Sequence, residues 1–206
     1  MPALKDAGVP VLFIDYYSPL YKFDYVYLDN YNLSYFATDY LIKNGHSKIG
    51  FVGNIQDTAS IRDRYLGYRK ALIEHNLKYR DEWHININLE HYNNFEKILS
   101  QNLPTAFVCH CDSAAQKLYL TLQMHGLSIP KDVSVISFDD TDDCKNMNPP
   151  LSSIGIGKEK LAKKSMAAMM DILNNQNKRQ VTLLKATLSE RNSVRNLLNH
   201  QDMTSN

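Results

Sequence analysis

The sequence has almost no excess of charge of either sign, and it contains no run of like charges that would follow a phosphate backbone. Its 23 lysines and arginines against 22 aspartates and glutamates leave a formal net charge of +1. Proteins that follow a nucleic-acid backbone usually carry a basic stripe or patch on their surface. The composition of this chain therefore offers no nucleic-acid footprint.

Long apolar runs and disulfide patterns are also missing. No apolar run approaches the roughly 20 residues that a membrane span needs, and the start, MPALKDAGVP, lacks the charged-then-apolar layout of a signal peptide. Three cysteines are an odd number at spacings that suggest no disulfide framework. We therefore expect a cytoplasmic protein with free thiols and no membrane contact.

What is present is a regular alternation of apolar runs with helical patterns, without internal repeats. The runs that predict strands are 9–14, 48–52, 84–88, 105–110, 133–138 and 181–188. The patterns that predict helices lie at about 33–43, 61–72, 95–99, 113–125 and 158–173. Parallel strands need long crossovers, which helices usually supply. The expected fold class is therefore α/β, with a Rossmann-like doubly wound parallel sheet.

Ligands of such sheets bind beyond the carboxyl ends of the strands, so the residues that follow each strand are candidate ligands. These include Asp15, Arg64, Cys111 and Asp139. A carboxylate, a guanidinium and polar neighbours at one rim suit a hydroxyl-rich small molecule. Each has a plainer alternative, since an arginine can be solvated at the surface and an aspartate can cap a turn. Arg62 and Arg64 are two apart on a helix, so at most one of them can face the cleft.

The stretch FVCHCDSAA at 107–115 is compatible with a metal site, a reactive thiol or a ligand-facing loop. A metal site lacks a second pair of ligands, and a catalytic cysteine would need a histidine beside it. Alternation along an extended segment favours Cys109 in the core, Cys111 facing the cleft and His110 pointing away. Asp112 precedes a helical pattern, so we expect it to cap a helix beginning near Ser113, worth about 1 kcal/mol.

In their order along the chain, seven motifs resemble the effector-binding domain of the LacI/GalR family of transcriptional regulators, which is similar to class I periplasmic sugar-binding proteins. The motifs are GVPVLFID, LDN, YLIKNGHSKIGFVG, IRDRYLGYRKAL, LPTAFVCHCDSAA, GLSIPKDVSVISFDD and NPPLSSI. The resemblance covers residues 8 to about 190. It implies a periplasmic-binding-protein-like fold with two lobes and a sugar or related small molecule bound between them.

The resemblance also assigns roles. It places Arg64, Asp139 and Asp15 at the effector, with Tyr92 stacking on it. Cys111 stands where the family usually has asparagine, so a thiol replaces an amide that can both donate and accept.

Because the resemblance begins inside the first lobe, we expect no counterpart here of the family's helix-turn-helix headpiece and of the start of that lobe. The expected organisation is a remnant of the N-terminal lobe, the C-terminal lobe, a return helix of the N-terminal lobe, the last strand of the C-terminal lobe and a polar tail, at 1–30, 31–150, 151–177, 178–191 and 192–206. We expect a homodimer, because the strand at 9–14 would otherwise leave an apolar edge open. DNA would be bound only through the headpiece, and effector binding by this chain would be weak.

The resemblance implies that the chain is an effector-sensing domain of a transcriptional regulator, which would couple ligand binding to DNA affinity in the full-length parent. Two other functions compete with this interpretation. A transport-type sugar-binding protein would share the fold but would normally carry an export signal. An enzyme on the same sheet would need a phosphate loop, and GFVGNIQD lacks the G-x-G-x-x-G spacing. We expect no enzymatic activity, no cofactor and no metal.

Overall fold

The computed structural model describes residues 8–86, 98, 102–174 and 179–198. The chain divides into two compact units, one formed by 1–29 with 156–186 and the other by 30–155 with 187–206. Each unit has its own sheet and its own buried side chains, so each is described on its own.

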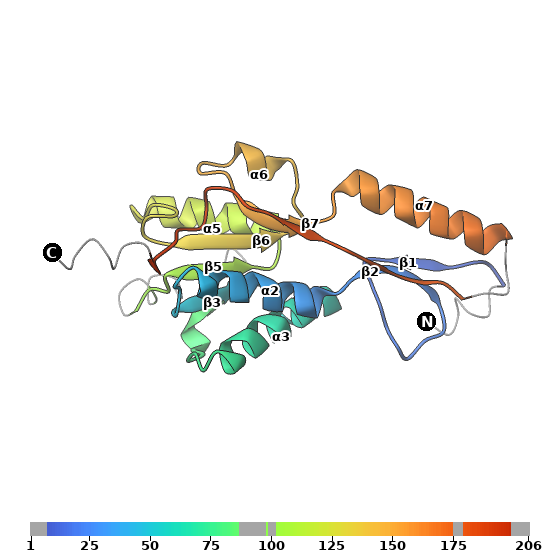
Figure 1. Cartoon of the computed structure of the whole chain (residues 1–206), viewed down its shortest axis with the longest axis horizontal. Helices are drawn as coiled ribbons and strands as arrows, with labels where there is room; N and C mark the ends of the chain where they lie inside the picture. The colour runs from blue at the N-terminus through green and yellow to red at the C-terminus, as the bar shows by residue number, and fades with distance from the viewer. Residues whose placement is uncertain (1–7, 87–97, 99–101, 175–178, 199–206) are drawn as a thin grey trace. The chain divides into compact units, whose positions relative to one another are not determined.

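The first unit contains a three-stranded parallel sheet in the order β1-β2-β8. The strands are β1 (Leu12–Ile14), β2 (Asp24–Leu28) and β8 (Val181–Leu184), and helix α7 (Lys158–Asn174) packs on β1 and β2 (Figure 1). Val26 of β2, Leu184 of β8 and Ala168 of α7 form one buried cluster.

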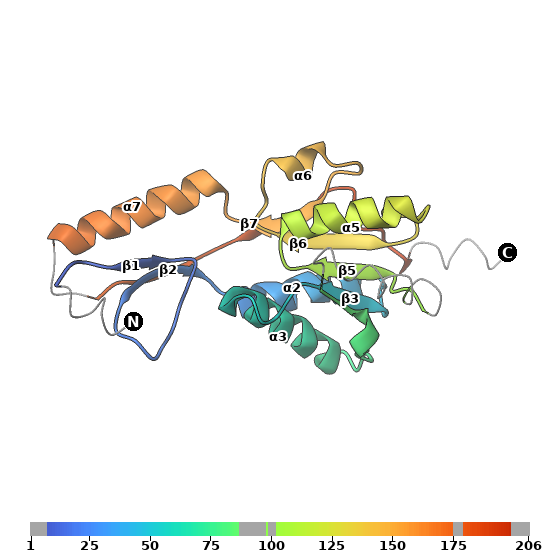
Figure 2. The same ribbon diagram turned by 180° about the vertical axis from the view of Figure 1, so that it is seen from behind.

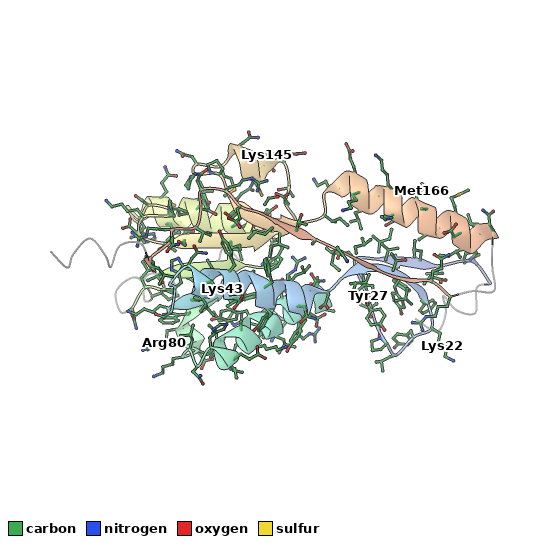
Figure 3. The ribbon with its side chains drawn as sticks, viewed as in Figure 1. Lys22, Tyr27, Lys43, Arg80, Lys145 and Met166 are labelled. Atoms are coloured by element: carbon green, nitrogen blue, oxygen red, sulfur yellow. The ribbon has the colours of Figure 1, made fainter. Side chains whose placement is uncertain are left out.

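The aromatic residues of the first unit gather around Tyr25. Tyr25 is next to Val26 on the strand, so its side chain lies on the opposite face of the sheet. The ring of Phe13 stacks on Tyr25 with centroids 5.7 Å apart, and Tyr17 stacks on Tyr27 at 4.5 Å (Figure 3 labels Tyr27). One face of this small sheet is therefore aliphatic and the other is aromatic.

The second unit contains a six-stranded sheet in the order β4-β3-β5-β6-β7-β9, in which only β9 runs antiparallel to its neighbour. The strands are β3 (Ile49–Val52), β4 (His84–Ile85), β5 (Ala106–Cys109), β6 (Ser134–Phe138), β7 (Ser152–Gly155) and β9 (Thr187–Ser189). All residues of β3, β5, β6 and β7 are buried, as parallel strands covered on both faces require. The predicted α/β fold with a doubly wound sheet is confirmed.

Helices cover both faces of this sheet. Helix α5 (Asp112–Met124) lies along β5 and β6, while α2 (Asn30–Lys43) and α3 (Ala59–Glu74) pack against each other on the other side (Figures 1 and 2). The described part of this unit also contains the short helices η1 (Asp81–Trp83) and α6 (Asp143–Asn146). A Cβ added at Gly67 of α3 would lie 2.0 Å from the carbonyl oxygen of Tyr31, so α2 and α3 approach closely only because residue 67 is glycine.

The strand predictions need three corrections. The strand expected at 9–14 is shorter, because β1 covers Leu12–Ile14 only. Strands β2, β7 and β9 were not predicted as separate strands. The single strand expected at 181–188 is two strands, of which β8 joins the first sheet and β9 the second. Of the residues described, no helix is both long enough and apolar enough to cross a membrane.

Candidate functional site

The side chain of Arg64 is the centre of the polar cluster at the carboxyl edge of the six-stranded sheet. It lies on α3 and is only 5% exposed, whereas Arg62 is exposed, as the two-residue spacing predicted. Its Nε donates to Asn30 Oδ1 at 2.8 Å, and its Nη1 donates to the carbonyl of His110. The guanidinium lies over the ring of Phe138, 4.6 Å from the centroid. The cation is therefore held rigidly at the ends of β5 and β6.

Asp139 lies beside this cation. Its Oδ1 is 3.4 Å from Arg64 Nη1, so the expected proximity of the two residues is confirmed. Their side chains are 6% exposed for Arg64 and 44% exposed for Asp139. The carboxylate of Asp139 is close enough to attract the guanidinium and remains accessible to solvent. Arg64 therefore offers hydrogen-bond donors to a polar ligand, and Asp139 offers acceptors.

The turn that carries Asp139 has a strained backbone. Both Asp139 and Asp140 have positive φ angles, 102° and 48°, which non-glycine residues adopt rarely. The Asp140 carboxylate bonds Arg191 Nη2 at 2.6 Å and Ser189 Oγ at 2.7 Å, which ties the turn to the segment around β9. A Cβ at residue 155 of β7 would lie 2.5 Å from the Asp139 carbonyl oxygen, so this position has to be glycine.

The expected role of Asp112 is wrong. The helix begins at Asp112 itself with Cys111 as its N-cap, and no side chain caps it. The Asp112 carboxylate turns inward instead and accepts hydrogen bonds from the hydroxyls of Ser137 and Ser153 and from the amide and hydroxyl of Thr141. It is 2% exposed, so these bonds replace the water that a buried carboxylate has lost.

Alternation along an extended segment predicted that His110 would point away from Cys111, and this prediction is wrong. Strand β5 ends at Cys109, and Cys111 Sγ lies 3.2 Å from His110 Nε2 and 3.1 Å from Ser113 Oγ. Burial opposes ionisation of Cys111, but the hydrogen bonds to His110 and Ser113 outweigh it and lower the pKa of this thiol.

The other two cysteines behave oppositely. Burial raises the pKa of Cys109 well above its usual range and raises that of Cys144 to about 12. Cys109 is fully buried, which confirms its expected place in the core. Of the three thiols, Cys111 is the only one that is partly accessible.

Two of the predicted ligands are not among the described residues of the second unit. Asp15 belongs to the first unit, where it follows β1 with a φ of 55° and is exposed. Tyr92 lies outside the described residues. Two participants in the Arg64 cluster were missed: the side chain of Asn30 and the carbonyl of His110. Asn30 stood within the LDN motif and could have been proposed from it, whereas nothing in a sequence marks a carbonyl.

A doubly wound parallel sheet with a buried, pre-oriented cation and an accessible carboxylate at its carboxyl edge defines a class of small-molecule-binding α/β domain. Residues 38–194 match the family described as periplasmic binding protein-like domain. The chain belongs to this family.

The relatives by sequence include repressors. The chain is 32% identical over 198 residues to the HTH-type transcriptional repressor PurR of Actinobacillus pleuropneumoniae serotype 3, covering 92% of this chain and 59% of that protein. It is 33% identical to PurR of Pectobacterium carotovorum, over 93% of this chain and 58% of that protein. The chain thus spans under two thirds of the length of these relatives.

Solved structures share the fold. A LacI transcriptional regulator of Bacillus cereus subsp. cytotoxis superposes with a TM-score of 0.84 at 26% identity, covering 95% of this chain and 71% of that one. A LacI-family regulator of Enterococcus faecium, solved with bound ribose, gives a TM-score of 0.81 at 24% identity, over 94% of this chain and 74% of that one. The resemblance to LacI/GalR regulators found in the motifs is confirmed.

Proposed function

We propose that the chain is the effector-sensing part of a LacI/GalR-like transcriptional regulator, and that Arg64 and Asp139 bind the effector. The observation that carries the proposal is the Arg64–Asp139 pair. Arg64 is fixed by Asn30 and by the His110 carbonyl, so it is oriented before any ligand arrives. Asp139 is 3.4 Å away and 44% exposed in its side chain, so it can accept hydrogen bonds from ligand hydroxyls.

The chemistry of the pair favours a neutral or weakly anionic molecule with several hydroxyls, and we propose a sugar or a related small molecule. A guanidinium donates and a carboxylate accepts, which matches groups that do both. Fold neighbours support this class, since their structures were solved with ribose and with cellobiose. Cys111, at the adjacent loop, would form part of the same site, and Asp15 and Tyr92 would contribute from other segments.

We propose that the six-stranded unit is the complete C-terminal lobe and that the three-stranded unit is part of the N-terminal lobe. In the longer protein, effector binding would alter DNA affinity through a separate headpiece, since the PurR relatives are described as HTH-type repressors.

We propose a cytoplasmic, non-enzymatic homodimer. Val9 and Ile14, around β1 at the edge of its sheet, are 59% and 50% exposed, which favours association between copies. Light scattering at micromolar concentration that gives a monomer would contradict this point.

A thermal-shift screen tests the effector site directly. Ribose, cellobiose, phosphorylated sugars and nucleosides are added to the 206-residue chain, and a ligand that binds the folded state raises Tm in a concentration-dependent way. Asp139→Asn removes the negative charge and should cost an active compound about tenfold or more in affinity. Asp142→Asn is the matched control, because Asp142 is in the same loop with its side chain 95% exposed. If Asp139→Asn binds as tightly as the unchanged protein, the effector site lies elsewhere.

A further inference from the structure

Cys111 and His110 form an arrangement that effector binding does not require. Cys111 Sγ lies 3.2 Å from Nε2 of His110, on the residue next to it. Nδ1 of the same ring lies 3.1 Å from the carbonyl oxygen of Val52. A carbonyl can only accept, so Nδ1 carries the proton and the neutral ring presents the lone pair of Nε2 to the thiol. The three groups are thus a nucleophile, a base and a group that orients the base.

The ring of His110 is held in this orientation by the strand ends around it. The backbone amide of His110 also donates to Val52 O, at 2.8 Å. Residue 53 is glycine, and a Cβ there would lie 2.9 Å from Nδ1 of the ring, so a larger side chain would displace the imidazole. Cys111 is half-buried and is the N-cap residue of the 13-residue helix α5, whose amino end favours a negative charge.

We propose that Cys111 and His110 form a thiolate–imidazolium pair, which makes Cys111 a modification site for soft carbon electrophiles and for peroxide. The proton of Cys111 moves to Nε2 of His110, and the thiolate attacks. With a haloacetamide, a sulfur–carbon bond forms and halide leaves with the bonding electrons. With hydrogen peroxide, sulfur bonds one oxygen and is oxidised to sulfenic acid, while the O–O bond breaks and the departing hydroxide takes the imidazolium proton to give water.

A group added to Cys111 would lie at the candidate effector site, because the carbonyl of His110 is the one that holds Arg64. Under the proposed function, modification of Cys111 would therefore weaken effector binding. The reactivity itself does not rest on that function and can be tested without an effector.

The test measures alkylation of the 206-residue chain by iodoacetamide between pH 5.5 and 9, with each cysteine followed by peptide mass spectrometry. Cys111 should be alkylated with a pH midpoint below that of the same peptide in the urea-unfolded chain, and several-fold faster at pH 6.5. Cys109 and Cys144 are buried and serve as internal controls that stay unmodified. A Cys111 midpoint equal to that of the unfolded chain would overturn the proposal.

Two histidine variants identify the base. His110→Gln should move the Cys111 midpoint back toward the unfolded value and slow alkylation at pH 6.5. His84→Gln is the matched control, because His84 Nε2 also bonds a strand-end carbonyl, that of Gly53, at 2.8 Å. It should leave the midpoint unchanged, and far-ultraviolet circular dichroism checks that both variants fold. An unchanged midpoint in His110→Gln would assign the reactivity to the helix alone and refute the pair.

Peroxide treatment followed by dimedone should trap a sulfenic acid adduct on Cys111, and failure to trap it would overturn the peroxide part of the proposal. The Tm shifts with ribose, cellobiose and nucleosides are then repeated on the alkylated chain. A reactive Cys111 in a chain that binds none of these compounds would support the thiolate pair and count against the sensing function, so the two failures can be told apart.

Discussion

Replacing Asp112 with alanine should destabilise the second unit far more than the loss of a helix cap. The carboxylate accepts from two serine hydroxyls, from the Thr141 amide at 2.8 Å and from the Thr141 hydroxyl at 2.9 Å. In Asp112→Ala all four donors lose this acceptor, and the amide of Thr141, which is part of the backbone, cannot rotate toward another group.

The magnitude follows from the groups left without a partner. Each buried donor that loses its acceptor costs about 1–3 kcal/mol, and part of that loss is offset because the buried carboxylate no longer has to be desolvated. We therefore expect Asp112→Ala to lower the free energy of unfolding by about 3 kcal/mol, against about 1 kcal/mol for a helix N-cap.

Urea unfolding followed by the fluorescence of the single tryptophan, Trp83, measures this loss, because Trp83 is 2% exposed in the same unit. Asp132→Ala is the matched control. The carboxylate of Asp132 is exposed and accepts a local bond from the Ser128 amide at 2.7 Å, so its loss should cost about 1 kcal/mol or less. Equal losses in the two variants would refute the network argument.

Two further predictions concern His46 and Gly67. Burial lowers the pKa of His46 to about 4, although its bond to the Arg195 carbonyl acts in the other direction. From about pH 6.5 down to 4 the unfolded chain binds a proton that the folded chain excludes, so stability falls by about 1.4 kcal/mol per pH unit, roughly 3 kcal/mol in all. Urea titrations across this range should show a shallower fall in His46→Gln, and identical slopes would contradict the assignment. Gly67→Ala would usually stabilise a helix by about 1 kcal/mol, but here its Cβ meets Tyr31, so we expect a loss of about 2 kcal/mol in the same assay; a gain would show that α2 and α3 separate easily.

Much of the second unit could be predicted because its strands are apolar runs that the sheet buries on both faces. The strand-end rule then predicted the Arg64–Asp139 pair from residues 75 positions apart. Strand β7 could not be found in this way. It begins with Ser152 and Ser153, which are wholly buried yet polar. Their hydrogen-bond partners come from about 40 residues away, since the Ser153 hydroxyl donates to Asp112 and the Ser152 hydroxyl accepts from the amide of Arg191.

The segment 181–188 shows a different limit. Its alternation predicts extended backbone, and the backbone is extended at both ends of the segment. The pattern does not encode which sheet each half joins, because both halves present similar side chains. β8 pairs with β2 and β9 pairs with β7, and only the three-dimensional arrangement separates them.

Asp112 was given the wrong role for the same reason that β7 was missed, because its hydrogen-bond partners lie far away in the sequence. Its true role shows that the two loops at the site are connected twice. Arg64 connects the loop after β5 to the loop after β6 by bonding the His110 carbonyl and Asp139. Asp112, two residues after His110, connects the same loops again by bonding Thr141, two residues after Asp139. The second connection is buried and needs no ligand. It therefore fixes the spacing of the loops, so that Asp139 can remain 3.4 Å from Arg64 and available to a ligand rather than closing into a tight ion pair.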